Sequence, residues 1–262
     1  MRCGAACVCA ALTLFAAAPA RGGPPYRTDD PEPVDVGHFE INMFSLGSDA
    51  SPGWGGLLPG VEVNYGAFPG LQLHVIVQQG YEAPAGGDLG VAFADVELGA
   101  KFRFLNPGDD DWYPEAGVFP TVEIPTGNPR LALSTGHAQV YLPLWLQKDF
   151  KPWSIFGGGG YWINSGAGNS NYGFFGVGVT RQVSEPLNIG IELFHQTETG
   201  ATASTTLQPA PGLGVAAQTG FNVGLVYDFS KTWHLLASAG TGLQNRDTTN
   251  RFSYYLALQL TF

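Results

Sequence analysis

Cysteine, charge and long apolar runs are all scarce in this chain of 262 residues. Its three cysteines, Cys3, Cys7 and Cys9, lie close to the N-terminus, so the rest of the chain has no disulfide framework, thiolate metal site or cysteine nucleophile. Charged residues make up 13% of the chain, about half of the share that is usual in soluble domains. No window reaches the roughly 18 consecutive apolar residues of a membrane-spanning helix. Low charge without such runs is typical of strands that face lipid on one side and water on the other.

The first twenty residues have the pattern of a secretory signal peptide. Arg2 is their only charge, the apolar run from Cys7 to Ala18 is too short to span a membrane, and Ala18-Pro19-Ala20 is a small-x-small cleavage site. A buried N-terminal helix would need an amphipathic spacing that this run lacks. We therefore expect residues 1–20 to be removed. The remaining chain has 11 basic and 22 acidic residues, a net charge of −11, which argues against nucleic acid as a partner.

The last eleven residues alternate strictly between two faces. Apolar side chains recur at every second position, at Phe252, Tyr254, Leu256, Leu258, Leu260 and Phe262. A strand of this length crosses a bilayer when it is tilted. It resembles the C-terminal strand of bacterial outer-membrane β-barrels, whose terminal Phe is recognised by the barrel-assembly machinery. Phe262, Leu260 and Leu258 are therefore the candidate assembly signal.

The same period predicts twelve strands, within one hairpin. They lie at about 38–46, 61–65, 71–78, 91–104, 115–124, 138–147, 154–164, 172–183, 187–197, 219–229, 234–243 and 252–262. Long connections at 47–59, 126–136 and 198–217 alternate with short ones near Phe68, Lys151, Glu185 and Lys231, and 106–113 is a long turn on the short side. Short periplasmic turns and long external loops are typical of outer-membrane barrels. We predict an all-β fold, a transmembrane antiparallel up-and-down β-barrel over residues 38–262, located in the outer membrane.

Residues 21–37 are rich in proline and acid. They are expected to form a periplasmic segment or a plug inserted into the barrel, and a disordered lead is the alternative.

Several short motifs resemble one known family. They are Pro24-Pro25-Tyr26-Arg27-Thr28-Asp29-Asp30-Pro31, Gly37-His38-Phe39-Glu40, 142–148, 157–162, 194–196 and 243–245. In these the chain resembles a family of outer-membrane channels named for an association with meta-cleavage phenol-degradation pathways. The resemblance covers nearly all of the mature chain. It implies a barrel that transports small molecules, with aromatic compounds as candidates, and it supplies no catalytic residues.

Alternation places a set of charged residues on the inward face. The lumen-lining candidates are Glu40, Glu62, Asp95, Glu97, Lys101, Arg103, Glu123 and Glu192. Six acids against two bases predict a lumen that favours cations. Alternatively, these charges pair across neighbouring strands, with Lys101 and Arg103 facing Glu123 or Glu62, and side chains fill the lumen.

Other residue groups give weaker signals. His195 and Thr197, two apart on one strand face, are compared with the His and Ser of outer-membrane phospholipases, but Thr is a poor match for Ser. Asp109-Asp110-Asp111 lacks the spacing of a calcium loop, and Gly157 to Gly160 lacks the lysine and helix of a phosphate loop. Aromatic residues near strand ends, including Trp145, Trp153 and Trp162, predict girdles at the membrane interfaces.

The sequence thus predicts a channel for passive passage of small solutes, and the family resemblance implies aromatic or other small hydrophobic compounds as candidates. The expected partners are outer-membrane lipid, the barrel-assembly machinery and the solutes. No enzyme activity, cofactor or metal is predicted. The alternatives are a non-conducting structural or adhesion barrel and a lipid esterase.

Overall fold

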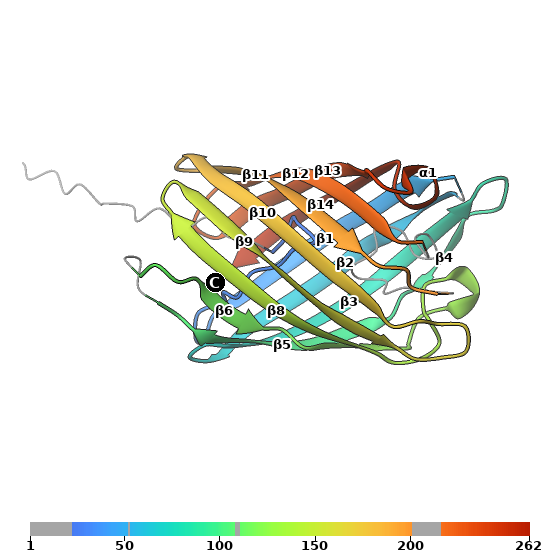
Figure 1. Ribbon diagram of the computed structural model, residues 1–262, viewed down its shortest axis with the longest axis horizontal. Helices are drawn as coiled ribbons and strands as arrows, with labels where there is room; N and C mark the ends of the chain where they lie inside the picture. The colour runs from blue at the N-terminus through green and yellow to red at the C-terminus, as the bar shows by residue number, and fades with distance from the viewer. Residues whose placement is uncertain (1–22, 52, 108–110, 201–215) are drawn as a thin grey trace, which may run out of the picture.

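The computed structural model describes residues 23–51, 53–107, 111–200 and 216–262, and the expected signal peptide lies outside them. The strands are β1 Phe39–Ala50, β2 Gly53–Phe68, β3 Leu71–Pro84, β4 Gly90–Phe93, β5 Val96–Leu105, β6 Glu115–Val118, β7 Thr121–Ile124, β8 Gln139–Phe150, β9 Trp153–Asn164, β10 Tyr172–Ser184, β11 Leu187–Gln196, β12 Gln218–Asp228, β13 Trp233–Gly242 and β14 Phe252–Thr261. Short helices occur at η1 Pro129–Leu131 and α1 Arg246–Thr249. The strands form one tilted antiparallel barrel (Figure 1).

The fourteen strand segments make twelve positions around the barrel. β4 and β5 both pair with β3, and β6 and β7 both lie between β5 and β8, so each pair occupies one position. The predicted twelve-stranded barrel is confirmed, but the two strands predicted at 91–104 and 115–124 are interrupted. Asp95 accepts a hydrogen bond from Gly127 N (2.9 Å) at one break. Pro120, which has no N–H to donate, lies at the other.

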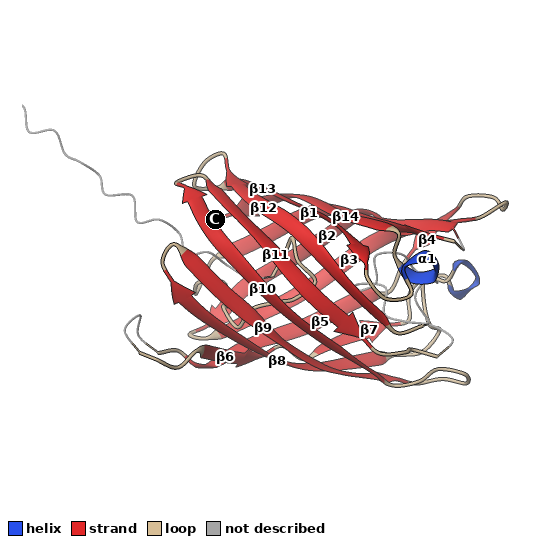
Figure 2. Ribbon diagram, turned by 45° about the horizontal axis from the view of Figure 1, so that its top comes forward, coloured by secondary structure: helices blue, strands red, loops and turns tan. Residues whose placement is uncertain are grey.

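The first and last strands close the barrel. β1 pairs with β14 from Glu40 opposite Thr261 to Asp49 opposite Phe252. Phe39 and Phe262 exchange two backbone hydrogen bonds, Phe39 N to Phe262 O (2.8 Å) and Phe262 N to Phe39 O (3.1 Å). We call the end of the barrel that holds these two residues the terminal end and the other the loop end; Figure 2 shows the longer connections and both helices at the loop end. Closure pairs the first strand with the last, so neither is left as a free sheet edge.

The predicted long connection at 47–59 is wrong. β1 continues to Ala50 and β2 begins at Gly53, with Gly47 opposite Gly56 in a continued ladder. Small residues let the two backbones stay paired, and an irregularity in β2 pairing between Leu57 and Gly60 takes up Pro59, which cannot donate to the ladder. The 126–136 connection contains η1, whereas most of 198–217 and part of 106–113 lie outside the described residues.

The outer surface is apolar along the strands. Leu256 and Leu258 on β14 are exposed while Ala257 between them is buried, and Leu98 on β5 is exposed while Glu97 is buried. This inside-out pattern matches a barrel whose outer face meets hydrocarbon. In the described part of the chain, no helix is long and apolar enough to cross a membrane.

Candidate functional site

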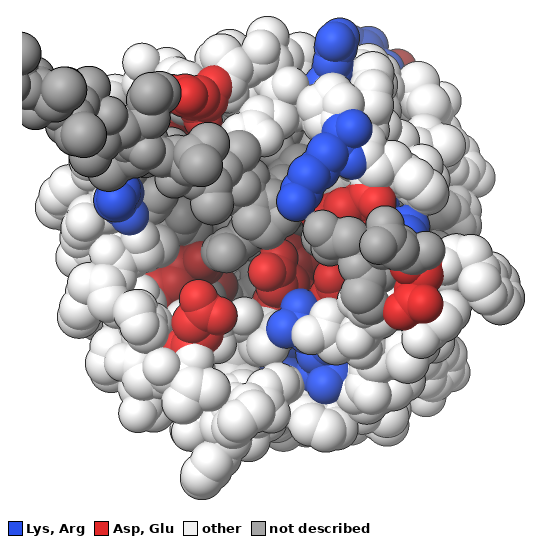
Figure 3. All heavy atoms as spheres, turned by 90° about the vertical axis from the view of Figure 1, so that its left-hand side faces the viewer, with Lys and Arg blue, Asp and Glu red and all other residues white. Residues whose placement is uncertain are grey.

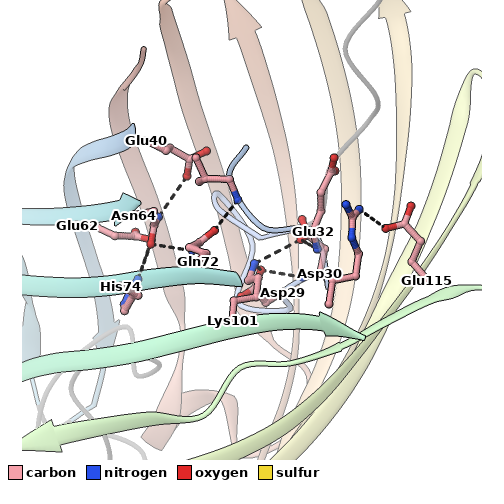
Figure 4. Close-up of polar contacts among 12 residues, drawn as sticks. Asp29, Asp30, Glu32, Glu40, Glu62, Asn64, Gln72, His74, Lys101 and Glu115 are labelled. Carbon is pink, nitrogen blue, oxygen red and sulfur yellow. Dashed lines mark hydrogen bonds and ion pairs between the residues drawn. The ribbon is translucent and has the colours of Figure 1, made fainter. Parts of the chain in front are cut away.

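Residues 23–37, which we call the inner segment, run inside the barrel and contact its wall at several strands (Figure 4). The Glu192 carboxylate on β11 accepts hydrogen bonds from Arg27 N (2.8 Å) and Thr28 N (2.9 Å). On β13, Ser238 Oγ donates to Pro25 O at 2.6 Å. On β3, Gln72 Oε1 accepts from Val34 N at 2.9 Å. The inner segment is therefore tied to opposite sides of the lumen through its backbone.

The two inward bases form ion pairs other than those the sequence suggested. Lys101 Nζ lies 3.0 Å from Asp29 Oδ1 and 3.4 Å from Asp30 Oδ1, both on the inner segment. Arg103 Nη1 lies 2.7 Å from Glu115 Oε2. The expected partners, Glu123 and Glu62, are therefore wrong for both bases. The reason is tertiary, because the inner segment occupies the space that Lys101 faces.

Arg27 places a cation inside the barrel, against the wall formed by β10 and β11. Its Nη2 donates to Gln196 Oε1 at 3.1 Å, and its guanidinium lies 4.3 Å from the ring centre of Phe194 and 5.0 Å from that of Phe174. Burial lowers the pKa of Arg27 to about 10, and Glu192 opposes that change. The group therefore stays charged at neutral pH. Its Nε and Nη1 have no hydrogen-bond partner among the described residues.

A polar network covers the wall formed by β1, β2, β3 and β5. Asn64 Nδ2 donates to Glu62 Oε1 (2.8 Å) and to Glu40 Oε1 (3.4 Å). His74 Nδ1 lies 2.7 Å from Asn64 Oδ1 (Figure 4). His74 Nε2 lies 3.1 Å from Glu97 Oε1. Three carboxylates thus share one amide and one imidazole, which favours a wall of net negative charge.

Aromatic rings cover the facing part of the wall. Tyr141 and Trp145 on β8, Trp162 on β9 and Tyr172 on β10 are all buried inside the barrel. Trp162 stacks on Tyr141 (centroids 4.7 Å apart) and on Tyr172 (5.8 Å).

The expectation that Trp145 and Trp162 belong to the interface girdles is therefore wrong, whereas Trp153 is exposed. Their alternation shows why. Trp145 shares its face with Gln139 and Gln147, and Trp162 shares its face with Asn164, so both rings belong to the polar, inward face.

Glycines at inward positions make room for the inner segment. A Cβ on Gly176 of β10 would meet Thr28, and the three nearest atoms all belong to that side chain. A Cβ on Gly224 of β12 would lie 2.9 Å from Tyr26 Cε1. A side chain at either position would therefore occupy the place of the inner segment.

Two cavities meet at the inner segment. One, of about 510 Å³, opens toward the terminal end and is lined by Asp29, Asp30, Glu40, Glu62 and Lys101 among others. The other, of about 160 Å³, lies deeper and is lined by Arg27, Glu97 and the aromatic rings, while Asp29 and Glu62 line both. Acidic side chains gather in the hollow at the terminal end, with Lys and Arg side chains in and around it (Figure 3).

The eight predicted charged residues separate into two groups. Glu40, Glu62, Glu97 and Lys101 line these cavities. The other four serve contacts within the protein: Arg103 pairs with Glu115, Asp95 accepts from Gly127 N, Glu123 accepts from Gln139 Nε2 (2.8 Å), and Glu192 accepts from Asn222 Nδ2 (2.6 Å) and the inner segment. Sequence reasoning missed His74, Asn64 and the aromatic rings, which alternation could have placed inside.

The esterase comparison finds no support in the geometry. His195 Nδ1 contacts Thr219 Oγ1 at 2.8 Å, and Thr197 Oγ1 accepts from Gly173 N at 2.9 Å. Thr197 thus serves the backbone of a neighbouring strand. Among the described residues, no group of three or more His, Cys, Asp or Glu side chains could hold a metal ion; of Asp109-Asp110-Asp111, only Asp111 is described.

The fold has close counterparts among solved structures although no protein-family model and no curated protein matches the sequence. The COG4313 outer membrane channel from Pseudomonas putida F1 superposes with a TM-score of 0.69 at 16% identity, covering 89% of this chain and 98% of that one. The KdgM porin has a TM-score of 0.57 at 12% identity, covering 85% and 99%. The NanC porin has a TM-score of 0.57 at 10% identity, covering 84% and 98%. The chain therefore has the fold of the outer-membrane β-barrel channels.

Proposed function

We propose that the protein lets small solutes pass passively across the outer membrane through its lumen. The observation that carries this proposal is a pair of cavities, each lined in part by charged side chains, inside a barrel with an apolar outer face. Water and polar solutes can enter such a lumen, whereas the surrounding hydrocarbon excludes them. A hydrated path of this kind is the basic requirement for permeation. We place the terminal end in the periplasm because its connections are the shorter ones.

We further propose small aromatic or other hydrophobic compounds as the solutes. The buried rings of Tyr141, Trp145 and Trp162 give the deeper cavity an apolar wall, which suits planar apolar molecules. The resemblance to channels associated with phenol degradation points the same way.

A specific observation favours a second candidate, a barrel that does not conduct. The inner segment lies between the two cavities and is held by Glu192, Lys101, Ser238 and Gln72. If it stays in place, it acts as a plug, and the barrel has a structural or adhesive role. The enzyme alternative is not proposed, because His195 and Thr197 make no catalytic constellation.

Single-channel recording in planar bilayers, together with liposome swelling, separates the two candidates. The panel of solutes contains sugars, amino acids, aromatic acids and inorganic ions. Discrete conductance steps and faster swelling with a subset of solutes are expected for a channel. A folded, heat-modifiable barrel that gives neither would favour the plugged, structural role.

A further inference from the structure

The deeper cavity has walls of three chemical characters. Around the barrel, β2 and β5 carry the acidic wall, which is Glu62 and Glu97. β8 and β9 carry the aromatic wall, which is Tyr141, Trp145 and Trp162. The inner segment presents Arg27 against β10 and β11, where it contacts Phe174 and Phe194. The five side chains of the acidic and aromatic walls and the side chain of Arg27 all line the same cavity of about 160 Å³.

The acidic wall and the Arg27 guanidinium lie on different sides of the lumen, and the Glu192 carboxylate lies beside Arg27. In the order of the sheet, β3 is the third and β11 the ninth of twelve positions, so they lie on opposite sides of the barrel. His74 on β3 contacts Glu97 of the acidic wall. Gln196 on β11 accepts a hydrogen bond from the Arg27 guanidinium. The low-dielectric walls of the barrel concentrate the electric field between the acidic wall and Arg27. A dipolar molecule in the cavity is oriented along that field.

Hydrogen-bond donors are left without acceptors at this cavity. Trp145 Nε1 and Trp162 Nε1 are buried and have no partner among the described residues, and the same holds for Nε and Nη1 of Arg27. Indole and guanidinium nitrogens can only donate. A buried donor without an acceptor is destabilising, so an acceptor brought by a ligand would recover that loss.

From this arrangement we propose that the deeper cavity binds small zwitterionic solutes with an apolar body, such as an aromatic amino acid. The carboxylate accepts hydrogen bonds from Arg27 and the indole N–H groups. The ammonium faces Glu62 and Glu97, and the apolar body lies on the rings of the aromatic wall. A solute with only one of the two charges is repelled by one side. This inference rests on the proposed function and specifies its solute class.

Isothermal titration calorimetry on the full chain, folded in detergent at pH 7, tests the charge requirement. The three probes are L-phenylalanine, 3-phenylpropanoate, which lacks the ammonium group, and 2-phenylethylamine, which lacks the carboxylate. Phenylalanine is expected to bind about tenfold more tightly than either analogue, since each charge-assisted contact is worth roughly one such factor. Equal affinity for the three probes, or no saturable binding of phenylalanine, would overturn the proposal.

Variants assign the contacts. Arg27→Gln should lower the affinity for phenylalanine and for 3-phenylpropanoate by about tenfold. The affinity for 2-phenylethylamine should not fall. Trp145→Phe keeps the ring and removes one donor, so it should weaken phenylalanine less than Arg27→Gln does. Arg181→Gln is the matched control, because Arg181 is exposed and contacts Trp153, outside the cavity. Unchanged phenylalanine affinity in a folded Arg27→Gln barrel would contradict the assignment.

Glu62→Gln keeps the result interpretable if Arg27→Gln fails to fold. It should lower the affinity for phenylalanine but raise the affinity for 3-phenylpropanoate. Structural damage alone would not produce these opposite changes. Planar-bilayer conductance of the wild-type protein separates this proposal from the channel proposal. Conductance without phenylalanine binding would reject the zwitterion site and keep the channel. Phenylalanine binding without conductance would keep the site and reject passive passage.

Discussion

At the scale of single residues, neighbouring side chains on one strand meet opposite environments. Leu98 on β5 is 41% exposed on the outer face, while Glu97 beside it is 6% exposed and contacts His74 inside. Leu98→Arg should cost about 2–4 kcal/mol if this position lies near the bilayer midplane, because lipid offers a charge no hydration. Glu97→Gln, which keeps an acceptor for His74, should cost far less. Reversible urea unfolding in lipid vesicles measures both, and equal costs would mean that the two faces are exchanged.

Lys101 supplies the positive charge that neutralises Asp29 and Asp30 of the inner segment. Its removal in Lys101→Met leaves Asp29 and Asp30 without their cation inside the barrel. We expect a loss of about 3–5 kcal/mol, since one partner of a buried ion pair is then uncompensated. The triple variant Lys101→Met/Asp29→Asn/Asp30→Asn should recover part of it, because no buried charge remains. The same urea unfolding assay gives both values, and no recovery in the triple variant would argue against the ion pair as the cause.

At the scale of whole elements, β14 determines closure. It pairs with β13 on one side and with β1 on the other, and Phe262, directly after it, exchanges two hydrogen bonds with Phe39. Deletion of Phe262 or Phe262→Ala should lower the yield of folded barrel in the outer membrane severalfold, because the terminal aromatic residue is the candidate assembly signal. Heat-modifiable mobility on gels reports folded barrel. Gln259→Asn on the inward face of β14 is the control, and an equal yield for Phe262→Ala and wild type would reject the role.

The inner segment is the second element whose position decides function. Gly176→Val should displace it, since the nearest atoms to the new side chain all belong to Thr28. Conductance is then expected to rise severalfold because the partition between the two cavities is removed. Val177→Ile, on the outer face of the same strand, should leave conductance unchanged. A Gly176→Val barrel that folds and conducts like the wild type would show that the segment does not limit permeation.

At the scale of the whole molecule, the acidic residues of the larger cavity should make an open channel prefer cations. Glu40 and Glu62 line the larger cavity, and their field raises the local cation concentration. Reversal potentials across a salt gradient measure the preference. It should shrink at high salt, where screening shortens to about 3 Å at 1 M. Glu40→Gln/Glu62→Gln should reduce it, whereas Asp88→Asn/Asp247→Asn, at exposed loop-end positions, should not. Equal changes of the reversal potential in both double variants would show that the acids of the larger cavity do not cause the preference.

Most of the barrel architecture could be predicted from the period-two alternation of apolar residues in the sequence. In β14 and β5, one face of the strand is apolar at every second position, and side-chain direction in a strand is a local property of the backbone. The same rule placed Glu97, Glu123 and Glu192 on the buried side. Where proline and glycine interrupt the pattern, as at 47–59 and near Pro120, local signals failed, because cross-strand pairing decides whether such segments stay in the ladder.

The sequence by itself determined the class of fold, the twelve strands and the two faces of the wall, because each follows from periodicity within one segment. Only the tertiary structure decided what the inward charges do. Lys101 meets Asp29 and Asp30, and Glu192 meets Arg27 and Thr28, across separations of at least 71 residues. Such contacts depend on where closure places distant strands and on the path of the inner segment through the lumen. No local pattern encodes either of them, since the barrel must close before these side chains face each other.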